Sequence, residues 1–276
     1  MPGIVRAALA VILVVMAGLV PSSSWAQVGG RVAVLGAPSL TAWNAEVVSK
    51  ILADGRFIAV DNIDVGTSTP SLATLQTYRA VIVYNDASVL SRATLGDNLH
   101  AYLLAGGGVV NAEFDTSTAH LAGAWATNTD TAIAGGGPTV GEATLGTIAL
   151  LAHPTVAGVT TFNGGFDSYR SSGAITPGST LVASWSTGEP LVAFKQVGAG
   201  TVVSLNFFPP SSDSRSGFWT ASTDGAKLMA NALVFAGDGA APPAPVPTLS
   251  EWAMILFGLI LAGGAALYIQ RRQSIA

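Results

Sequence analysis

The stretches RVAVLG at residues 31–36 and AVIVYND at residues 80–86 decide the fold. Each is short, apolar and rich in β-branched residues, and each ends at glycine or polar residues, as buried strands do. Two further runs have the same character, at residues 57–65 and 109–112. Helical spacing is found between these runs, at residues 44–53, 72–78 and 94–105. The alternation predicts a wound, mainly parallel sheet with helices on both faces.

The second half of the chain predicts β structure of another kind. Three β segments are expected at residues 180–185, 190–196 and 201–207, separated by short turns that contain glycine. Such turns favour antiparallel hairpins appended to the sheet, although the order of these last strands stays open. A helix at residues 224–235 closes the domain. In the helix at residues 44–53, the apolar spacing predicts a buried face made of Ala45, Val48, Ile51 and Leu52.

Composition excludes several functions. The chain has 276 residues, no cysteine, 50% hydrophobic residues and a formal net charge of −4. Residues 27–239 hold nine basic and fifteen acidic side chains with no basic cluster, so nucleic acid is not an expected partner. The lack of cysteine excludes disulfides, thiolate metal sites and a cysteine nucleophile.

The N-terminus reads as a signal peptide over residues 1–26. Arg6 precedes a 14-residue apolar run, and the small residues Ser24 and Ala26 precede a predicted cleavage site at Gln27. An uncleaved anchor is the alternative, but the run is shorter than the ~20 residues that span a bilayer.

The C-terminus reads as a membrane anchor. A proline-rich linker at residues 240–247 leads to the 18 uncharged residues 252–269, enough for one transmembrane helix. Trp252 and Tyr268 lie near its two ends, and the Arg271–Arg272 pair predicts a cytoplasmic C-terminus. The domain at residues 27–239 is therefore expected to be exported to the periplasm and anchored in the inner membrane.

The same tail resembles a sorting signal over residues 246–272. The motif Val246-Pro247-Thr248-Leu249-Ser250-Glu251-Trp252, the apolar helix and Arg271-Arg272 are similar to the IPTL-CTERM signal of Gram-negative bacteria. That consensus opens with isoleucine and has glycine after the tryptophan, where this chain has Val246 and Ala253. The resemblance implies an exosortase-type enzyme as partner and onward sorting to the cell surface or matrix; a plain single-pass anchor is the alternative.

The domain at residues 27–239 also resembles a known family of domains. Tyr84-Asn85-Asp86, residues 103–110 and the segment from His153-Pro154 to Phe162 are similar to class I glutamine amidotransferase-like domains, in particular their trehalose-utilization-like branch. The resemblance covers residues 31–237 and implies a flavodoxin-like or amidotransferase-like fold. Catalytic members use a cysteine with histidine and glutamate partners, and this chain has no cysteine.

Ligands of a wound parallel sheet collect at the carboxyl ends of its strands. The residues expected there are Ala37, Pro38, Ser39, Asn85, Asp86, Asn111, Glu113, Asp115 and Asn206. Among these, Asp86, Glu113 and Asp115, with His120, are weak candidates for general acid–base work, and the acids alone for a Ca²⁺ site. The alternative is that Asp86 caps a helix and Asp115 lies in a turn.

Other chemistry is not indicated. No Gly-x-Ser-x-Gly elbow occurs, and His100, His120 and His153 are too scattered for a zinc site, so no cofactor or metal is expected. His100 is expected on a helix surface and His153 in a loop. Aromatic residues of the second half are candidates for stacking on an extracellular polysaccharide, with core packing as the alternative: Phe166, Tyr169, Trp185, Phe207, Phe208, Phe218 and Trp219.

Three functions stay open. The first is a non-catalytic domain with a binding or structural role at the cell envelope. The second is a hydrolase-like enzyme acting on glycans through the acidic residues of the sheet rim. The third is a scaffold subunit of a surface-assembly system.

Overall fold

A computed structural model describes residues 30–116 and 121–238. Chain contacts separate two compact units, Met1–Gly239 and Ala240–Ala276, and all described residues belong to the first. The predicted signal peptide, linker, transmembrane helix and sorting motif lie outside the described residues. Within residues 30–116 and 121–238, no helix is long and apolar enough to cross a membrane.

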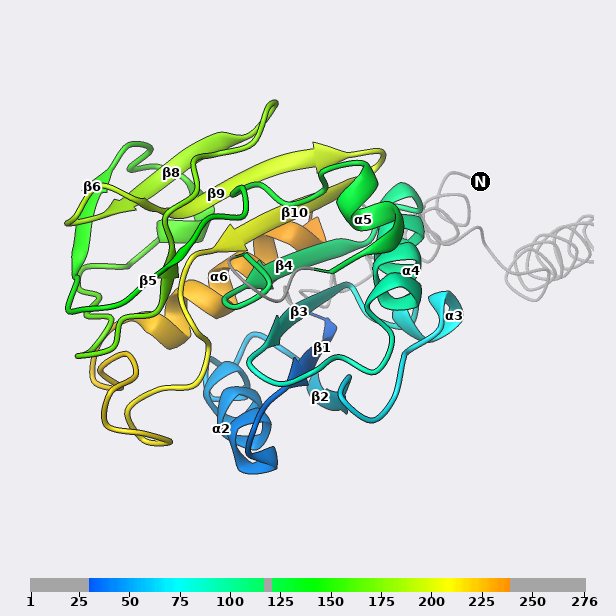
Figure 1. The fold of residues 1–276 in the computed structure, drawn as a ribbon, viewed down its shortest axis with the longest axis horizontal. Helices are drawn as coiled ribbons and strands as arrows, with labels where there is room; N and C mark the ends of the chain where they lie inside the picture. The colour runs from blue at the N-terminus through cyan, green and yellow to red at the C-terminus, as the bar shows by residue number, and fades with distance from the viewer. Residues whose placement is uncertain (1–29, 117–120, 239–276) are drawn as a thin grey trace, which may run out of the picture. The chain divides into compact units, whose positions relative to one another are not determined.

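The domain is built on one eight-stranded sheet (Figure 1). Five parallel strands form one half, in the order β2 (Ala59–Asp64), β1 (Arg31–Ala37), β3 (Ala80–Asn85), β4 (Gly108–Ala112) and β10 (Gly200–Leu205). Antiparallel strands continue from β10, in the order β9 (Pro190–Val197), β8 (Thr180–Trp185) and β6 (Leu145–Ile148). The predicted α/β class and its antiparallel extension are confirmed. The strand order left open is now resolved, because β10 returns beside β4 and joins the two halves.

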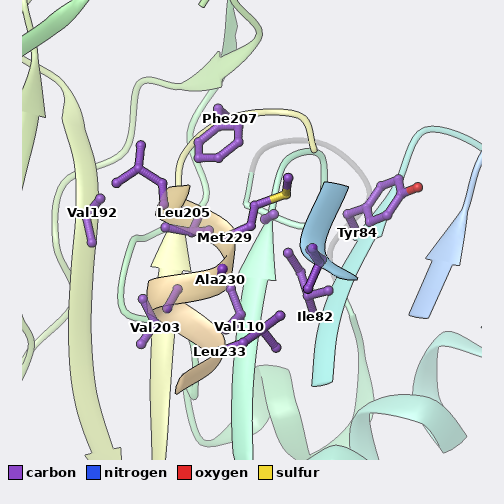
Figure 2. Close-up of a cluster of buried hydrophobic side chains, with 14 of the residues drawn as sticks. Ile82, Tyr84, Val110, Val192, Val203, Leu205, Phe207, Met229, Ala230 and Leu233 are labelled. Carbon is purple, nitrogen blue, oxygen red and sulfur yellow. The ribbon is translucent and has the colours of Figure 1, made fainter. Parts of the chain in front are cut away.

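Helices cover both faces of the parallel half, which explains the apolar, buried sequences of β1 and β3. On one face α2 (Thr41–Leu52) and α6 (Gly225–Asp238) share a core with Val32 and Val34. Figure 2 shows Met229, Ala230 and Leu233 of α6 among the strand side chains of this core. On the other face α3 (Leu72–Leu75), α4 (Arg92–Leu104) and α5 (Gly123–Thr127) share a core with Ala33 and Leu35. Successive residues of β1 thus enter opposite cores, as the pleat requires.

The predicted face of α2 is confirmed at Ile51 and Val48 but wrong at Ala45 and Leu52. The helix begins at Thr41 and buries Trp43, Asn44, Val47 and Ile51, whereas Ala45 and Leu52 are exposed. The reason is a buried polar residue. The Asn44 side chain donates hydrogen bonds to the Gly36 carbonyl (3.2 Å) and to Asn62 Oδ1 (3.0 Å) and accepts one from the Tyr84 hydroxyl. Apolar periodicity cannot reveal such a residue.

Several short elements were not predicted. They are β5 (Pro138–Thr139), β6, β7 (Arg170–Ser171), α5 and a 3₁₀ turn, η1 (Pro154–Val156). The strands among them have two to four residues, and β6 lies at the sheet edge, so none carries a clear apolar repeat.

Both ends of the described domain lie at the amino edge of the parallel sheet. Gly30 directly precedes β1, and Arg79 directly precedes β3; a Cβ added at Gly30 would lie only 2.6 Å from Cδ of Arg79, so the two residues are close together. Arg79 also binds Asp238, the last residue of α6, with its Nη2 2.7 Å from Asp238 Oδ1. The carboxyl ends of the parallel strands, where ligands of such sheets collect, therefore form the opposite edge.

Candidate functional site

The carboxyl edge has a topological switch point between β1 and β3, since the chain leaves β1 toward β2 on one side and returns to β3 on the other. Asp86 follows β3 at this point. The backbone N–H and the hydroxyl of Ser39 donate to its two carboxylate oxygens at 2.7 and 2.8 Å. The backbone N–H of Asp86 in turn donates to the Ala37 carbonyl. Asp86 therefore fixes the turn that follows β1.

Beyond β4, Asp115 belongs to a buried polar cluster. The Leu121 N–H donates to Asp115 Oδ1 at 2.6 Å, and Asn111 Nδ2 lies 3.4 Å from Asp115 Oδ2. Asn111 also donates to the Thr131 hydroxyl (3.0 Å) and accepts from the Ser204 hydroxyl (2.6 Å). The cluster connects β4, β10 and the loop that follows α5.

Glu113 lies beneath the rim and is fully buried. The Thr116 hydroxyl donates to its carboxylate, and its backbone N–H donates to the Phe207 carbonyl at 3.2 Å. The cis peptide after it leads to Phe114, whose N–H donates to the Asn85 carbonyl at 2.9 Å. These bonds tie together the chain segments that leave β3, β4 and β10.

Asn206, at the end of β10, is also fully buried. Its Oδ1 accepts from the Ser171 N–H (2.6 Å), and its Nδ2 donates to the carbonyls of Ser171 (2.9 Å) and Pro190 (2.7 Å). All three bonds connect it to backbone groups, so Asn206 acts as a structural bridge between segments.

Most of the aromatic candidates are buried, so the core-packing alternative holds for them and stacking on a ligand does not. The core contains Trp185, Phe207, Phe208, Phe218 and Trp219. The exception is Phe166, which is 80% exposed. Tyr169 is half-buried and packs 5.1 Å from the ring of Phe114, also half-buried, at the end of β4. Of the seven candidates, Phe166 and Tyr169 therefore have ring surface accessible for stacking on a carbohydrate. Phe114, which was not a candidate, lies beside Tyr169.

His100 and His153 have separate surroundings. His120 lies outside the described residues. His153 caps η1 and packs against the rings of Phe194 and Phe235, where burial lowers its pKa. His100 was expected on the surface, but its side chain is only 18% exposed and its Nδ1 lies 2.8 Å from Asp130 Oδ2. The expectation failed because Asp130 is thirty positions away in sequence.

The structure thus brings the sequence-predicted residues to one edge but gives each of them a separate bonding role. Asp86 binds the turn after β1, whereas Glu113 and Asp115 bind segments that follow β4. Within residues 30–116 and 121–238, no group of three histidine, aspartate or glutamate side chains could hold a metal ion.

Two open hollows lie on the antiparallel half of the domain. One, of about 510 Å³, is lined by residues 172–175 and 187–190 together with Leu181. The other, of about 470 Å³, lies beside β6 and is lined by the side chains of Thr144, Thr160, Thr161, Asn163 and Thr223, among others. Both combine apolar side chains with hydroxyl groups on an accessible surface.

Solved structures define the class to which this fold belongs. The chain is similar to a ThuA-like protein of Parabacteroides merdae, with 18% identity and a TM-score of 0.54 over 79% of this chain and 93% of that chain. It is also similar to a cytoplasmic protein of Salmonella typhimurium LT2, with 12% identity and a TM-score of 0.55 over 75% of this chain and 99% of that chain. At these identities the likeness establishes a ThuA-like, amidotransferase-like fold and nothing about activity.

The C-terminal segment of the chain also matches a known motif. Residues 244–273 match the IPTL-CTERM motif, a C-terminal sorting signal. The resemblance seen in the sequence is confirmed for this segment. No curated protein sequence matches the chain significantly.

Proposed function

We propose that this chain is an exported, surface-sorted protein. Its α/β domain has a binding or structural role at the cell envelope and does not catalyse a reaction. The observation that carries the proposal is the burial and bonding of the rim acids. Glu113 is fully buried, and Asp115 is only 3% exposed and accepts a backbone hydrogen bond. A general acid or base must come within about hydrogen-bond reach of substrate, directly or through one water. Asp86, the most accessible of the three, is occupied by Ser39.

The ends of the chain supply the route. A signal peptide at residues 1–26 directs export, and the helix at residues 252–269 holds the protein in the inner membrane. An exosortase-type enzyme then acts on the segment from Val246 to Trp252 and passes the domain toward the surface or matrix. The IPTL-CTERM match supports this route.

Extracellular polysaccharide is the ligand that we favour. Phe166 offers an exposed aromatic face, and the open hollows carry the hydroxyl and amide groups that hydrogen-bond to sugars. A role as a scaffold in surface assembly would use the same export route but no glycan.

The route is tested by localisation. The full chain and a double variant, Pro247→Ala with Trp252→Ala, are expressed in a Gram-negative host with and without an exosortase-type enzyme. We expect surface-exposed protein only for the unaltered chain in the host that has the enzyme. Equal surface exposure of the double variant would refute the sorting role of the motif.

The absence of catalysis is tested separately. The purified full chain is incubated with exopolysaccharides and their esterified forms, next to a Glu113→Gln variant. Release of reducing ends or of acyl groups by the unaltered chain, lost in the variant, would establish the hydrolase alternative. Binding of exopolysaccharide by both proteins without turnover is the result expected from the proposal, whereas no binding by either would leave the scaffold role.

A further inference from the structure

The segment at residues 121–131, here called the α5 strap, is fastened to the rest of the domain at several points. At its start Leu121 is bonded to Asp115, and the N–H of Ala124 donates to Asp97 Oδ1 of α4 at 2.6 Å. At its end Thr131 accepts a hydrogen bond from Asn111. The strap therefore joins α4 to two polar residues of the rim.

One of these fastenings is a buried carboxylate–imidazole pair. The side chain of Asp130 is 1% exposed, and its Oδ2 lies 2.8 Å from Nδ1 of His100 on α4. Its Oδ1 has no hydrogen-bond partner among the described residues. Lys195 of β9 is a second charge that acts on Asp130, and its Nζ donates to the Thr129 carbonyl at 2.6 Å.

We propose that the His100–Asp130 pair is a pH-responsive latch that fastens the α5 strap to α4 more tightly in weakly acidic than in alkaline solution. Histidine is the side chain whose charge changes between pH 5 and 8. An imidazolium would give Asp130 a charge-assisted hydrogen bond. When the imidazole is neutral, the buried carboxylate keeps one hydrogen bond but loses its nearest positive charge, which is costly in a desolvated site.

Asp130 acts in the same direction. Burial raises the pKa of Asp130, and the hydrogen bond and charge of His100, then the charge of Lys195, offset only part of that effect. A raised carboxyl pKa means that the folded strap disfavours the charged form. This penalty appears as the pH rises from ~3.8 through the raised pKa and is constant above it.

Release of the strap would also remove hydrogen bonds from polar residues of the rim. Because Leu121 and Thr131 are bonded to Asp115 and Asn111, a released strap removes one partner from each of these buried polar groups. The latch thus connects a pH-sensitive pair on one side of the sheet to the edge where ligands of this fold collect.

Hydrogen exchange of the full chain in detergent micelles tests the latch. Protection factors of the backbone amides at residues 121–131 are measured from pH 5.5 to 8.5, after correction for intrinsic exchange rates. We expect them to fall about tenfold over this range, the order of magnitude that one charge-assisted hydrogen bond contributes. The amides of β1 report global unfolding and should show no such fall.

Three variants decide the cause. In His100→Gln, which cannot become charged, we expect low protection that does not vary with pH. Asp97→Asn is the matched control, because it weakens a different contact between the strap and α4 and should lower protection at every pH while keeping the tenfold slope. Asp130→Asn removes the buried charge and should also abolish the slope. A pH-independent strap in the unaltered chain, or an unchanged slope in either His100→Gln or Asp130→Asn, would overturn the proposal.

Discussion

Replacing Asn206 by alanine tests whether this residue is structural. The substitution removes three hydrogen bonds at once and leaves the Ser171 N–H and the carbonyls of Ser171 and Pro190 without their partner. Each buried unsatisfied group costs ~1–3 kcal/mol. Because the loop at Ser171 can relax and the terms are not additive, we expect a total loss of about 3–6 kcal/mol. This is a large part of the ~5–15 kcal/mol that stabilises an ordinary domain.

Urea unfolding of the full chain, followed by tryptophan fluorescence, measures this loss as a lower midpoint with an unchanged slope. Asn128→Ala is the matched control, because Asn128 is exposed and its Nδ2 makes one hydrogen bond, to the Ala124 carbonyl at 2.7 Å. The control should cost no more than ~0.5 kcal/mol. A loss below ~1.5 kcal/mol for Asn206→Ala, or one equal to that of the control, would refute the reasoning.

Two further substitutions test the packing and the electrostatics of the domain. Gly36→Ala would place a Cβ 1.9 Å from Asn44 Oδ1 and displace that buried side chain, so we expect a loss of about 3 kcal/mol, whereas Gly137→Ala, with its nearest neighbour at 3.9 Å, should be near neutral in the same unfolding assay. Asp224 has a low pKa: burial alone would raise it, but hydrogen bonds from Lys227, Thr160 and Thr161 outweigh that effect. A lowered carboxyl pKa contributes stability that is present above ~3.9 and lost as the pH falls, so Asp224→Asn should cost about 1–2 kcal/mol at pH 7 and much less at pH 3. Equal costs at the two pH values would contradict this account.

Local pattern was sufficient for the inner strands β1, β3 and β4 of the parallel half. Their apolar runs are long because helices cover both faces, so each run is recognisable without knowledge of its neighbours. The segment predicted at residues 180–185 has the same bounds as β8. The pattern failed where polar side chains are buried, as at Asn44 in α2, and where strands are only two to four residues long, as at β5, β6 and β7.

The candidate site shows the same division. Strand ends place Asn85, Asp86 and Asn111 at the carboxyl edge in the sequence, and the structure has them there. Their bonding partners could not be predicted: Ser39 lies 47 positions from Asp86, and Ser204 lies 93 positions from Asn111. The prediction that these acids do not act on a substrate is tested by the turnover experiment with Glu113→Gln described above.

The sequence by itself determined the wound parallel sheet and the C-terminal sorting motif, because apolar runs and a contiguous motif are properties of neighbouring residues. Only the tertiary structure decided the return of β10 beside β4, the burial of Glu113, and the pairing of His100 with Asp130. The physical reason is that these features depend on contacts between distant parts of the chain. Such contacts are selected by the packing of the whole domain, and local propensity carries no record of them.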